Sequence, residues 1–290
     1  MAELPQKHRV SVSGVLKILG VSRSGYRAWK QRVPSVSEKH RDHIKDAIKQ
    51  IYDGSHQNYG APKITEMLHR QGESIAEKTV GNYMRQMGIK AQWVKPYTVT
   101  TIDSDFSSEL QNILDEQFNP SRPDAVWVSD ITYIWTYNGF VYLTSIMDLY
   151  SRKIIAWVLS REAIHVVECV NKAKQMRNVT SPLVFHSDRG IQFVSQAFQK
   201  VTEGMINSYS KKAYPWDNAC IESFHSLLKR EWLNRFKIFD YKHAYRLVFE
   251  YIETFYNTVR IHSHCGYLSP DEYEKQYRNK LLELEQKLAG

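Results

Sequence analysis

The succession of hydrophobic patterns after residue 126 constrains the fold of this chain more than any other feature of its 290 residues. Residues 126–134 and 140–148 are apolar, β-branched runs that predict strands, and the Asn138-Gly139 pair between them is a strong signal for a hairpin. The later patterns predict a third strand over 151–160, a helix over 162–176, a strand over 183–187, a helix over 195–203, a strand over 205–210 and an amphipathic helix that reaches Trp232. This order of elements is typical of a mixed α/β domain.

Three acidic residues are placed within this pattern so that each belongs to a different element. Asp130 lies inside the first strand, Asp188 follows the strand over 183–187, and Glu222 opens the amphipathic helix. Such carboxylates can converge on a pair of divalent cations, because Mg²⁺ takes oxygen ligands from few carboxylates and keeps positions for water and phosphate. Two ions about 3.5–4 Å apart can stabilise both the attacking and the leaving oxygen of a phosphoryl displacement. The pattern therefore predicts chemistry that cuts and joins nucleic acid strands.

The segments that carry these carboxylates resemble a known group of proteins. Residues 126–157, 186–199 and 216–232 resemble the catalytic core of bacterial insertion-sequence transposases with two overlapping frames, OrfA and OrfB, in the superfamily of retroviral integrases. The similarity to the OrfB product runs through nearly the whole chain. It implies a ribonuclease-H-like integrase core, an α/β domain with a mixed five-stranded sheet, preceded by all-α helix-turn-helix modules. In that fold the first and fourth strands are neighbours, which would place Asp130 beside Asp188, and the helix of Glu222 would pack across their edge.

The resemblance also implies which residues form the site. The catalytic residues and metal ligands would be Asp130, Asp188 and Glu222. They would hold two Mg²⁺ ions, which Mn²⁺ is expected to replace, with Asp130 bridging both ions. Lys229, seven residues after Glu222, would contact the terminal DNA of the element. The neighbours expected to support the site are His186, Arg189 and Asn218.

Several residues near these motifs have plainer interpretations. His186 is more often a structural hydrogen-bonding residue than a ligand or base, and Asp148 is interpreted as a hairpin-end residue near Arg152. His262 and His264 lack a third ligand in register, so a metal site there is disfavoured. A group of aromatic residues is expected to lie in the core, namely Trp127, Tyr133, Trp135 and Trp157.

The net charge of +8 is distributed unevenly. Residues 1–100 hold 17 Lys and Arg against 8 Asp and Glu, whereas the remainder holds 22 against 23, so the first part carries +9 and the rest −1. A basic segment of this kind indicates a polyanionic partner, although a well-solvated basic surface would look the same. Residues 1–35 predict a helix-turn-helix in which Tyr26, Trp29 and Val33 form a buried side. The stripe suited to DNA on its second helix consists of Arg23, Arg27 and Lys30.

A second helical module is predicted over residues 38–90. It repeats the polar stripe as Lys78, Asn82 and Arg85 and resembles a second helix-turn-helix, with a helical packing module as the alternative. Residues 91–122 are interpreted as a linker, 123–235 as the catalytic core and 236–290 as a C-terminal helical extension. Which of the two modules reads DNA ends is left open.

Cysteine usage and hydropathy exclude several classes of protein. Cys169, Cys220 and Cys265 are far apart, so neither a disulfide framework nor a zinc site is indicated. No apolar run approaches 18 residues and the N-terminus has no signal-peptide core, so we expect a cytoplasmic, nucleoid-associated protein.

The sequence therefore predicts a DNA transposase that acts on terminal inverted repeats and target DNA. The resemblance implies a homo-oligomer on DNA and cooperation with an OrfA product or an OrfA fusion. One alternative is a catalytically idle DNA-binding regulator with the same fold. Another is a nuclease of the ribonuclease-H type, which would need a fourth carboxylate and no helix-turn-helix modules.

Overall fold

The computed structural model describes residues 11–92, 110–179, 181–211 and 215–289. The chain divides into two compact parts at Gln50 and Ile51, and each part is described by itself. Most of the expected linker, from residue 93 to 109, lies outside the described residues.

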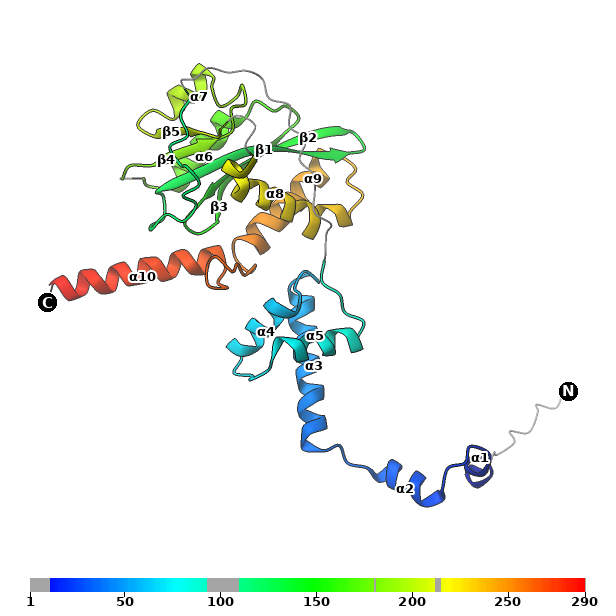
Figure 1. Ribbon diagram of the computed structural model, residues 1–290. Helices are drawn as coiled ribbons and strands as arrows, with labels where there is room; N and C mark the ends of the chain where they lie inside the picture. The colour runs from blue at the N-terminus through cyan, green and yellow to red at the C-terminus, as the bar shows by residue number, and fades with distance from the viewer. Residues whose placement is uncertain (1–10, 93–109, 180, 212–214, 290) are drawn as a thin grey trace. The chain divides into compact units, whose positions relative to one another are not determined.

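The first part contains α1 (Val12–Ile18), α2 (Arg23–Gln31) and most of α3 (Val36–Gly54) (Figure 1). Ser22 caps α2 as predicted, since its side chain accepts a hydrogen bond of 3.0 Å from the backbone N–H of Gly25. The predicted buried side of α2 is wrong, because Trp29 is 70% exposed and Val33 is 75% exposed. The helix ends at Gln31, and Val33 precedes Pro34, a position that disfavours helical backbone.

The helices α4 (Ala61–Arg70) and α5 (Glu77–Gln86) form the module that the sequence predicts after α3. Ile64 and Leu68 of α4 and Val80 and Met84 of α5 are buried, so the apolar faces of the two helices are used as expected. The helices contact each other directly. This leaves Lys78 and Arg85 exposed on the other side of α5.

A five-stranded sheet forms the centre of the second part, with the strand order β3-β2-β1-β4-β5. The strands are β1 (Val126–Thr136), β2 (Gly139–Asp148), β3 (Ile154–Ser160), β4 (Val184–Ser187) and β5 (Ile206–Tyr209). The first three strands pair antiparallel, whereas β1–β4 and β4–β5 pair parallel. The mixed sheet and the predicted contact between the first and fourth strands are both confirmed.

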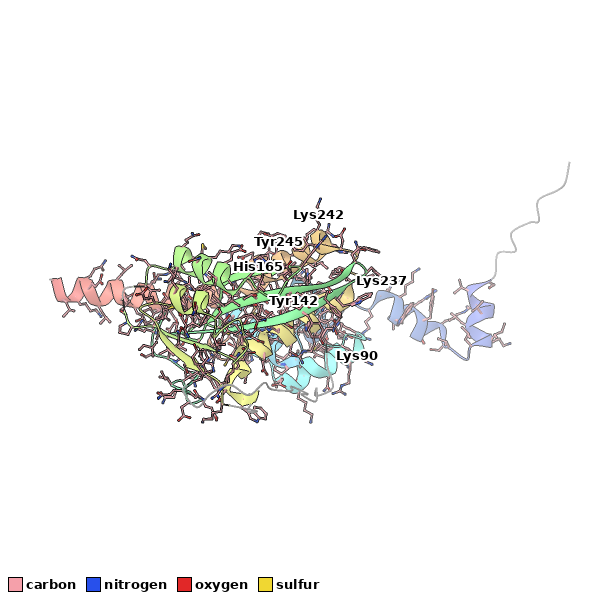
Figure 2. All side chains as sticks on the ribbon, turned by 90° about the horizontal axis from the view of Figure 1, so that it is seen from above. Lys90, Tyr142, His165, Lys237, Lys242 and Tyr245 are labelled. Atoms are coloured by element: carbon pink, nitrogen blue, oxygen red, sulfur yellow. The ribbon has the colours of Figure 1, made fainter. Side chains whose placement is uncertain are left out.

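The β1–β2 hairpin extends past the point where β4 ends. Its turn is Tyr137-Asn138, as the Asn-Gly signal predicts, and Gly139 adopts φ +98°, a left-handed conformation that favours glycine. Figure 2 shows this hairpin from above, with Tyr142 labelled on it. The expectation that its aromatic residues belong to the core is wrong at two positions, because Tyr133 is 58% exposed and Trp135 is 54% exposed.

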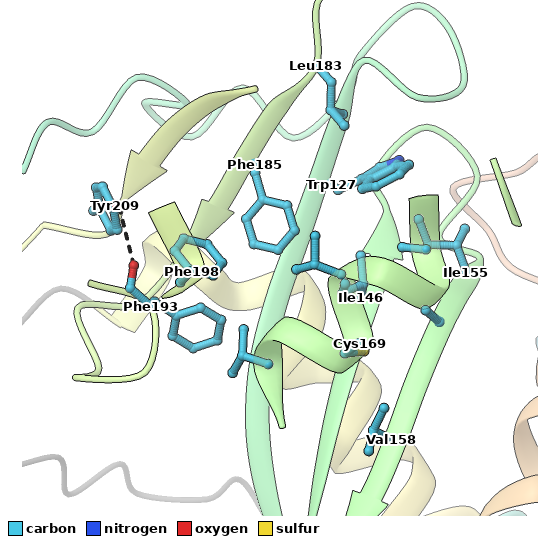
Figure 3. Close-up of a cluster of buried hydrophobic side chains, with 14 residues drawn as sticks. Trp127, Ile146, Ile155, Val158, Cys169, Leu183, Phe185, Phe193, Phe198 and Tyr209 are labelled. Atoms are coloured by element: carbon cyan, nitrogen blue, oxygen red, sulfur yellow. Dashed lines mark hydrogen bonds between the residues drawn. The ribbon is translucent and has the colours of Figure 1, made fainter. Parts of the chain in front are cut away.

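The reason lies in how far the helices cover the sheet. Helix α6 (Val166–Met176) packs on β2 and β3, and the core beneath it includes Trp127, Ile146 and Phe185 (Figure 3). Helix α7 (Gln196–Val201) adds Phe198 to the same cluster. The cluster reaches along β1 only as far as Ile131, so the next two side chains on that face are left uncovered.

The other face of the sheet carries α8 (Ala219–Glu231), which contacts β1 and β2. The 3₁₀ turns Pro215–Asn218 and Leu233–Arg235 flank it, and α9 (Tyr241–Phe249) continues into a π-helical turn, Glu250–Tyr256. The final helix, α10 (Pro270–Ala289), begins with the predicted capping box, in which Ser269 and Glu272 exchange hydrogen bonds. None of the described helices is long and apolar enough to cross a membrane.

Candidate active site

The parallel pairing of β1 and β4 brings the two aspartates to the same edge of the sheet. Ser129 of β1 and Ser187 of β4 are register partners, and each is followed directly by one of the two aspartates, Asp130 and Asp188. Both aspartates are partly exposed, whereas the serines before them are buried. The core thus ends at the serines, and the carboxylates begin the solvent-accessible side of this edge.

Helix α8 is attached to β1 by polar contacts on both sides of Glu222. Four residues before Glu222, the side-chain amide of the buried Asn218 donates a 3.2 Å hydrogen bond to the carbonyl oxygen of Ser129. Three residues after it, the Nδ1 of the buried His225 lies 3.2 Å from Oδ2 of Asp130. Because residues three and four apart share one helix face, Glu222 is directed toward the same region as Asp130.

His225 has a second contact on its other ring nitrogen. Its Nε2 lies 2.8 Å from Oγ of Ser145, a fully buried residue of β2 that is the register partner of Asp130. An imidazole with its proton on Nδ1 satisfies both contacts, with Ser145 donating to Nε2. The ring therefore joins Asp130 to the neighbouring strand.

The charges of the three carboxylates are coupled. The pKa of Glu222 is raised to about 7, first because the surrounding protein limits hydration of its carboxylate, and then because Asp130 and Asp188 add negative charge. The fold thus brings three negative charges close together, and a bound divalent cation would reduce the repulsion between them. No three His, Cys, Asp or Glu side chains in the described part of the chain are already close enough to form a metal cluster. The fit to Mg²⁺ lies in the all-oxygen donor set and the shared charge.

The loop after β4 is shaped around Asp188. The backbone N–H of Gly190 donates a 2.9 Å hydrogen bond to Oδ1 of Asp188. A Cβ atom at Gly190 would lie only 2.9 Å from the same oxygen and 3.1 Å from Oε1 of Gln192. Glycine is therefore required for this close approach.

Two of the expected supporting residues hold the backbone near this loop. Arg189 donates to the carbonyl oxygens of Ser210, at 2.8 Å, and Leu110, at 3.1 Å. His186 is fully buried, contacts the hydroxyls of Ser208 and Ser210 at 2.9 and 3.2 Å, and has its pKa lowered to about 4 by burial. These contacts agree with the interpretation of His186 as a structural hydrogen-bonding residue.

Lys229 lies against the same strand as Asp130. Its Nζ donates a 2.7 Å hydrogen bond to Oγ1 of Thr132 and lies 4.7 Å from the ring centroid of Tyr133. Burial lowers the pKa of Lys229, while the nearby charge of Asp130 acts in the opposite direction. A cation is thus held two to three residues along β1 from the acidic site.

Asp148 occupies a different environment from the three carboxylates. It is fully buried at the end of β2 and accepts hydrogen bonds of 2.8 and 2.9 Å from the backbone N–H groups of Asp124 and Tyr150. Burial raises its pKa to about 7. This carboxylate stabilises the turn between β2 and β3, as its interpretation as a hairpin-end residue anticipates, although Arg152 itself donates to the carbonyl oxygen of Leu149.

The remaining candidates for DNA binding lie on the N-terminal helices. On α2, the exposed stripe is Arg23, Arg27 and Lys30. On α5, Lys78 and Arg85 are exposed, and Arg85 donates a 2.8 Å hydrogen bond to the side-chain oxygen of Asn82.

The sequence did not single out His225 or its partner Ser145 at the carboxylate site. A histidine inside an amphipathic helix has no signal of its own, because its contacts depend on how the helix packs on the sheet.

The fold and this site define a protein with an integrase catalytic core. Two family models described as "Integrase core domain" match residues 120–205 and 203–270, and one described as "HTH-like domain" matches residues 39–97. The two core matches together cover every strand of the sheet, α8 and α9.

Curated relatives extend the similarity to nearly the whole chain. The chain is 32% identical to the transposase InsF for insertion sequence IS3A of Escherichia coli (strain K12), over 93% of this chain and 97% of the relative. It is 34% identical to the transposase for insertion sequence element IS904 of Lactococcus lactis subsp. lactis (strain IL1403), over 84% and 98%. The chain therefore belongs to the IS3 family of insertion-sequence transposases, polynucleotidyl transferases that combine an integrase core with an HTH-like domain.

Solved structures are more distant. The HTLV-2 integrase catalytic core domain in complex with magnesium is 15% identical, with a TM-score of 0.41, over 53% of this chain and 98% of that one. The catalytic domain of the Mos1 mariner transposase is 13% identical, with a TM-score of 0.39, over 52% and 74%.

Proposed function

We propose that this transposase binds the ends of its own element and catalyses metal-dependent cleavage of a DNA strand followed by strand transfer. The observation that supports this most is the attachment of α8 to β1, which directs Glu222 toward Asp130 and Asp188 and couples the charges of all three. A coupled set of carboxylates at a sheet edge is suited to a reaction at phosphate, where negative charge must be stabilised.

Asp130, Asp188 and Glu222 are the proposed ligands of two Mg²⁺ ions, which Mn²⁺ would replace. When bound, such ions supply Lewis acidity at the scissile phosphate and lower the cost of generating the attacking oxygen nucleophile. The protein's own contribution is orientation. His225 fixes Oδ2 of Asp130, the Gly190 N–H fixes Oδ1 of Asp188, and Lys229 is near enough to contact a phosphate beside the scissile one.

The reaction proceeds as two displacements at phosphorus, a hydrolysis followed by a transesterification. In the first, water attacks the phosphodiester at the element's end, a new P–O bond forms, and the bond to the 3′ oxygen breaks to give a 3′-OH. In the second, that 3′-OH attacks another phosphodiester and displaces its 3′ oxygen. No covalent enzyme intermediate and no nucleotide cofactor are required, because each P–O bond that breaks is replaced by another.

DNA binding is proposed for the N-terminal modules. Residues 1–35 and 38–90 would act as two helix-turn-helix modules, with 91–122 as a linker to a core over 123–235 and a helical extension over 236–290. The support is the +9 charge of residues 1–100 and the exposure of the cationic side chains on α2 and α5. Neutralising several phosphates would make binding fall steeply with salt.

The partners proposed for the chain are the terminal inverted repeats, the target DNA, further copies of itself on DNA, and an OrfA product or fusion. A cytoplasmic, nucleoid-associated location fits these partners. The supporting observation is membership of the IS3 family.

Incubation of the purified full chain with end DNA and Mg²⁺, with and without the OrfA product, tests the proposed reaction. We expect a nicked end and a joined product in at least one of these mixtures and none when the metal is chelated. DNA binding without cleavage or joining in both mixtures would instead identify a catalytically idle regulator.

A further inference from the structure

Five aromatic side chains at the outer end of the β1–β2 hairpin are exposed to solvent. Tyr133, Trp135, Tyr137 and Phe140 of the hairpin and Phe239 of the segment just before α9 are each more than half exposed. We call these five residues the aromatic surface. We propose that the aromatic surface binds unpaired nucleotides of a DNA strand next to the active site by stacking on their bases.

The rings form two neighbouring groups, each held in place by mutual contacts. The ring centroids of Tyr133 and Phe140 are 5.5 Å apart, those of Trp135 and Tyr137 are 4.9 Å apart, and those of Tyr137 and Phe239 are 5.7 Å apart. The backbone N–H of Tyr137 also donates a 3.0 Å hydrogen bond to the carbonyl oxygen of Ile238, which ties the hairpin turn to the segment of Phe239. Rings already ordered in this way lose little conformational entropy when a base stacks on them.

Burial in the core does not account for these side chains. The cluster under α6 ends at Ile131 on this face of β1, and the register places Tyr133 opposite Tyr142 and Trp135 opposite Phe140 beyond it. A contiguous exposed apolar patch on a folded protein marks an interaction site. The aromatic composition points to a partner with flat, polarisable groups.

The charges around the aromatic surface favour nucleic acid as that partner. The hairpin contains no charged side chain from Ile131 to Met147. The carboxylate beside Phe239, that of Asp240, caps α9 by accepting a hydrogen bond from the backbone N–H of His243. Lys229 lies over the ring of Tyr133, and Lys237, labelled in Figure 2, is exposed next to Ile238. Aromatic faces flanked by cations are the arrangement that binds single-stranded nucleic acid, with bases on the rings and phosphates on the cations.

The aromatic surface is separated from Asp130 both along β1 and by the two faces of the sheet. At about 3.3 Å per residue, Tyr133 lies roughly 10 Å and Trp135 roughly 16 Å from Asp130 along β1. Asp130 and Thr132 project from the α8 face of β1, whereas Tyr133 and Trp135 project from the opposite face. Lys229 connects the two faces, because its Nζ contacts both Thr132 and the ring of Tyr133. A strand that leaves the scissile phosphate would therefore pass Lys229 at this edge of β1 before it reached the rings.

The inference rests on the proposed function only in taking DNA as the ligand, so binding is measured without catalysis. The probe is an oligothymidylate of about 16 nucleotides, the upper end of typical site sizes, titrated with the full chain in the presence of a metal chelator. Thymidylate is chosen because it does not pair with itself. Salt is raised until binding by the basic helices is suppressed.

We expect Trp135→Ala and Phe140→Ala each to weaken binding of the oligothymidylate by about five- to hundredfold, the range for one lost base stack. Trp135→Phe should retain most of the affinity. Phe249→Ala is the matched control, because Phe249 is 45% exposed on α9 outside the aromatic surface. All three substituted side chains are exposed, so the unfolding midpoint of each variant should stay within a few degrees of the wild type.

An unchanged affinity for the oligothymidylate in both alanine variants would overturn the proposal. The alanine variants can also be compared with the wild type by sedimentation without DNA. If they lose self-association while their oligothymidylate binding is unchanged, the proposal is also overturned, because the aromatic surface then binds a second copy of the chain. Failure of end-DNA cleavage would bear on the carboxylates alone, since this binding assay requires neither metal nor catalysis.

Discussion

The imidazole of His225 lies 3.2 Å from the carboxylate of Asp130 and thereby connects the helix of one proposed metal ligand to the strand of another. Its other nitrogen contacts Ser145, so the ring is fixed from both sides. Residues that hold a ligating carboxylate in this way tune metal affinity without contacting the metal themselves. The contact gives His225 a positioning role that can be measured apart from catalysis.

Substitution His225→Ala should weaken Mn²⁺ binding by the full chain by about ten- to hundredfold, because Asp130 loses the hydrogen bond that orients it. Ser145→Ala should weaken Mn²⁺ binding less, since it removes only the hydrogen bond to Nε2 of His225 and leaves the contact between Nδ1 and Asp130 in place. The concentration of free Mn²⁺ can be measured by electron paramagnetic resonance during a titration, with no DNA present. Ser226→Ala, an exposed serine on the same helix, is the control, and equal affinities in all four proteins would rule out the positioning role.

Gly190→Ala should reduce strand cleavage by roughly ten- to hundredfold, because an added Cβ would sit 2.9 Å from Oδ1 of Asp188 and displace it. Gly54→Ala is a suitable control, since no atom lies within 4 Å of the Cβ it would add. Cleavage rates under single-turnover conditions, together with unfolding midpoints, distinguish a displaced carboxylate from a destabilised protein. A wild-type rate in Gly190→Ala would show that the close approach does not matter for the reaction.

Lys229→Ala should weaken binding of cleaved end DNA by about tenfold, the loss of one charge-assisted contact to phosphate, and should slow joining. Mn²⁺ binding by the free protein should not weaken, because Lys229 contacts Thr132 and Tyr133 and is not a proposed ligand. Lys275→Ala, on the exposed side of α10, provides the comparison. If the two lysine variants bind and join end DNA equally well, Lys229 is only a structural side chain of the β1 surface.

A buried ion pair connects the end of α8 to the C-terminal region. Both oxygens of Glu231 accept 2.7 Å hydrogen bonds from Arg260, and Tyr251 donates a further one of 2.8 Å. Burial raises the pKa of Glu231, but the bonds and charge of Arg260 outweigh this and leave it below the ordinary 4.5. The resulting stabilisation is fully present above that pH and is lost as the pH falls through the lowered pKa.

Arg260→Ala should therefore destabilise the full chain by about 3–5 kcal/mol, because it leaves the carboxylate of Glu231 buried and unpaired. Urea unfolding at neutral pH, followed by tryptophan fluorescence, measures the change. A second substitution, Glu231→Gln, should recover part of the loss by removing the buried charge. A loss below 1 kcal/mol for Arg260→Ala would show that the pair contributes little to the attachment of α8.

The placement of Asp130 beside Asp188 could be predicted from the sequence, because the resemblance to the integrase core implies that the first and fourth strands are neighbours, and β1 does pair with β4. The capping box at Ser269 and the hairpin turn were likewise predictable, since both depend on residues close together in the chain. His225 could not be found in this way, because its role depends on the rotation of α8 against the sheet.

The exposed aromatic residues show a second limit of sequence patterns. Tyr133 and Trp135 alternate with buried Thr132 and Ile134, as in any half-buried strand, and hydrophobicity alone favours placing the rings inside. Which face is covered depends on where α6 ends, and that information lies in another segment of the chain. The burial that the sequence predicts for Trp29 is wrong for a similar reason, because an apolar helix face is buried only where another element covers it.

The central claim is that Asp130, Asp188 and Glu222 act together in one metal-dependent site. Its most direct test is strand cleavage and joining of end DNA in Mg²⁺ by Asp130→Asn, Asp188→Asn and Glu222→Gln, which preserve shape and remove one charge each. The account predicts loss of both reactions in all three variants, by a factor of at least about a thousand, with end-DNA binding nearly unchanged. Cleavage at the wild-type rate by any one of them would contradict it and remove that residue from the site.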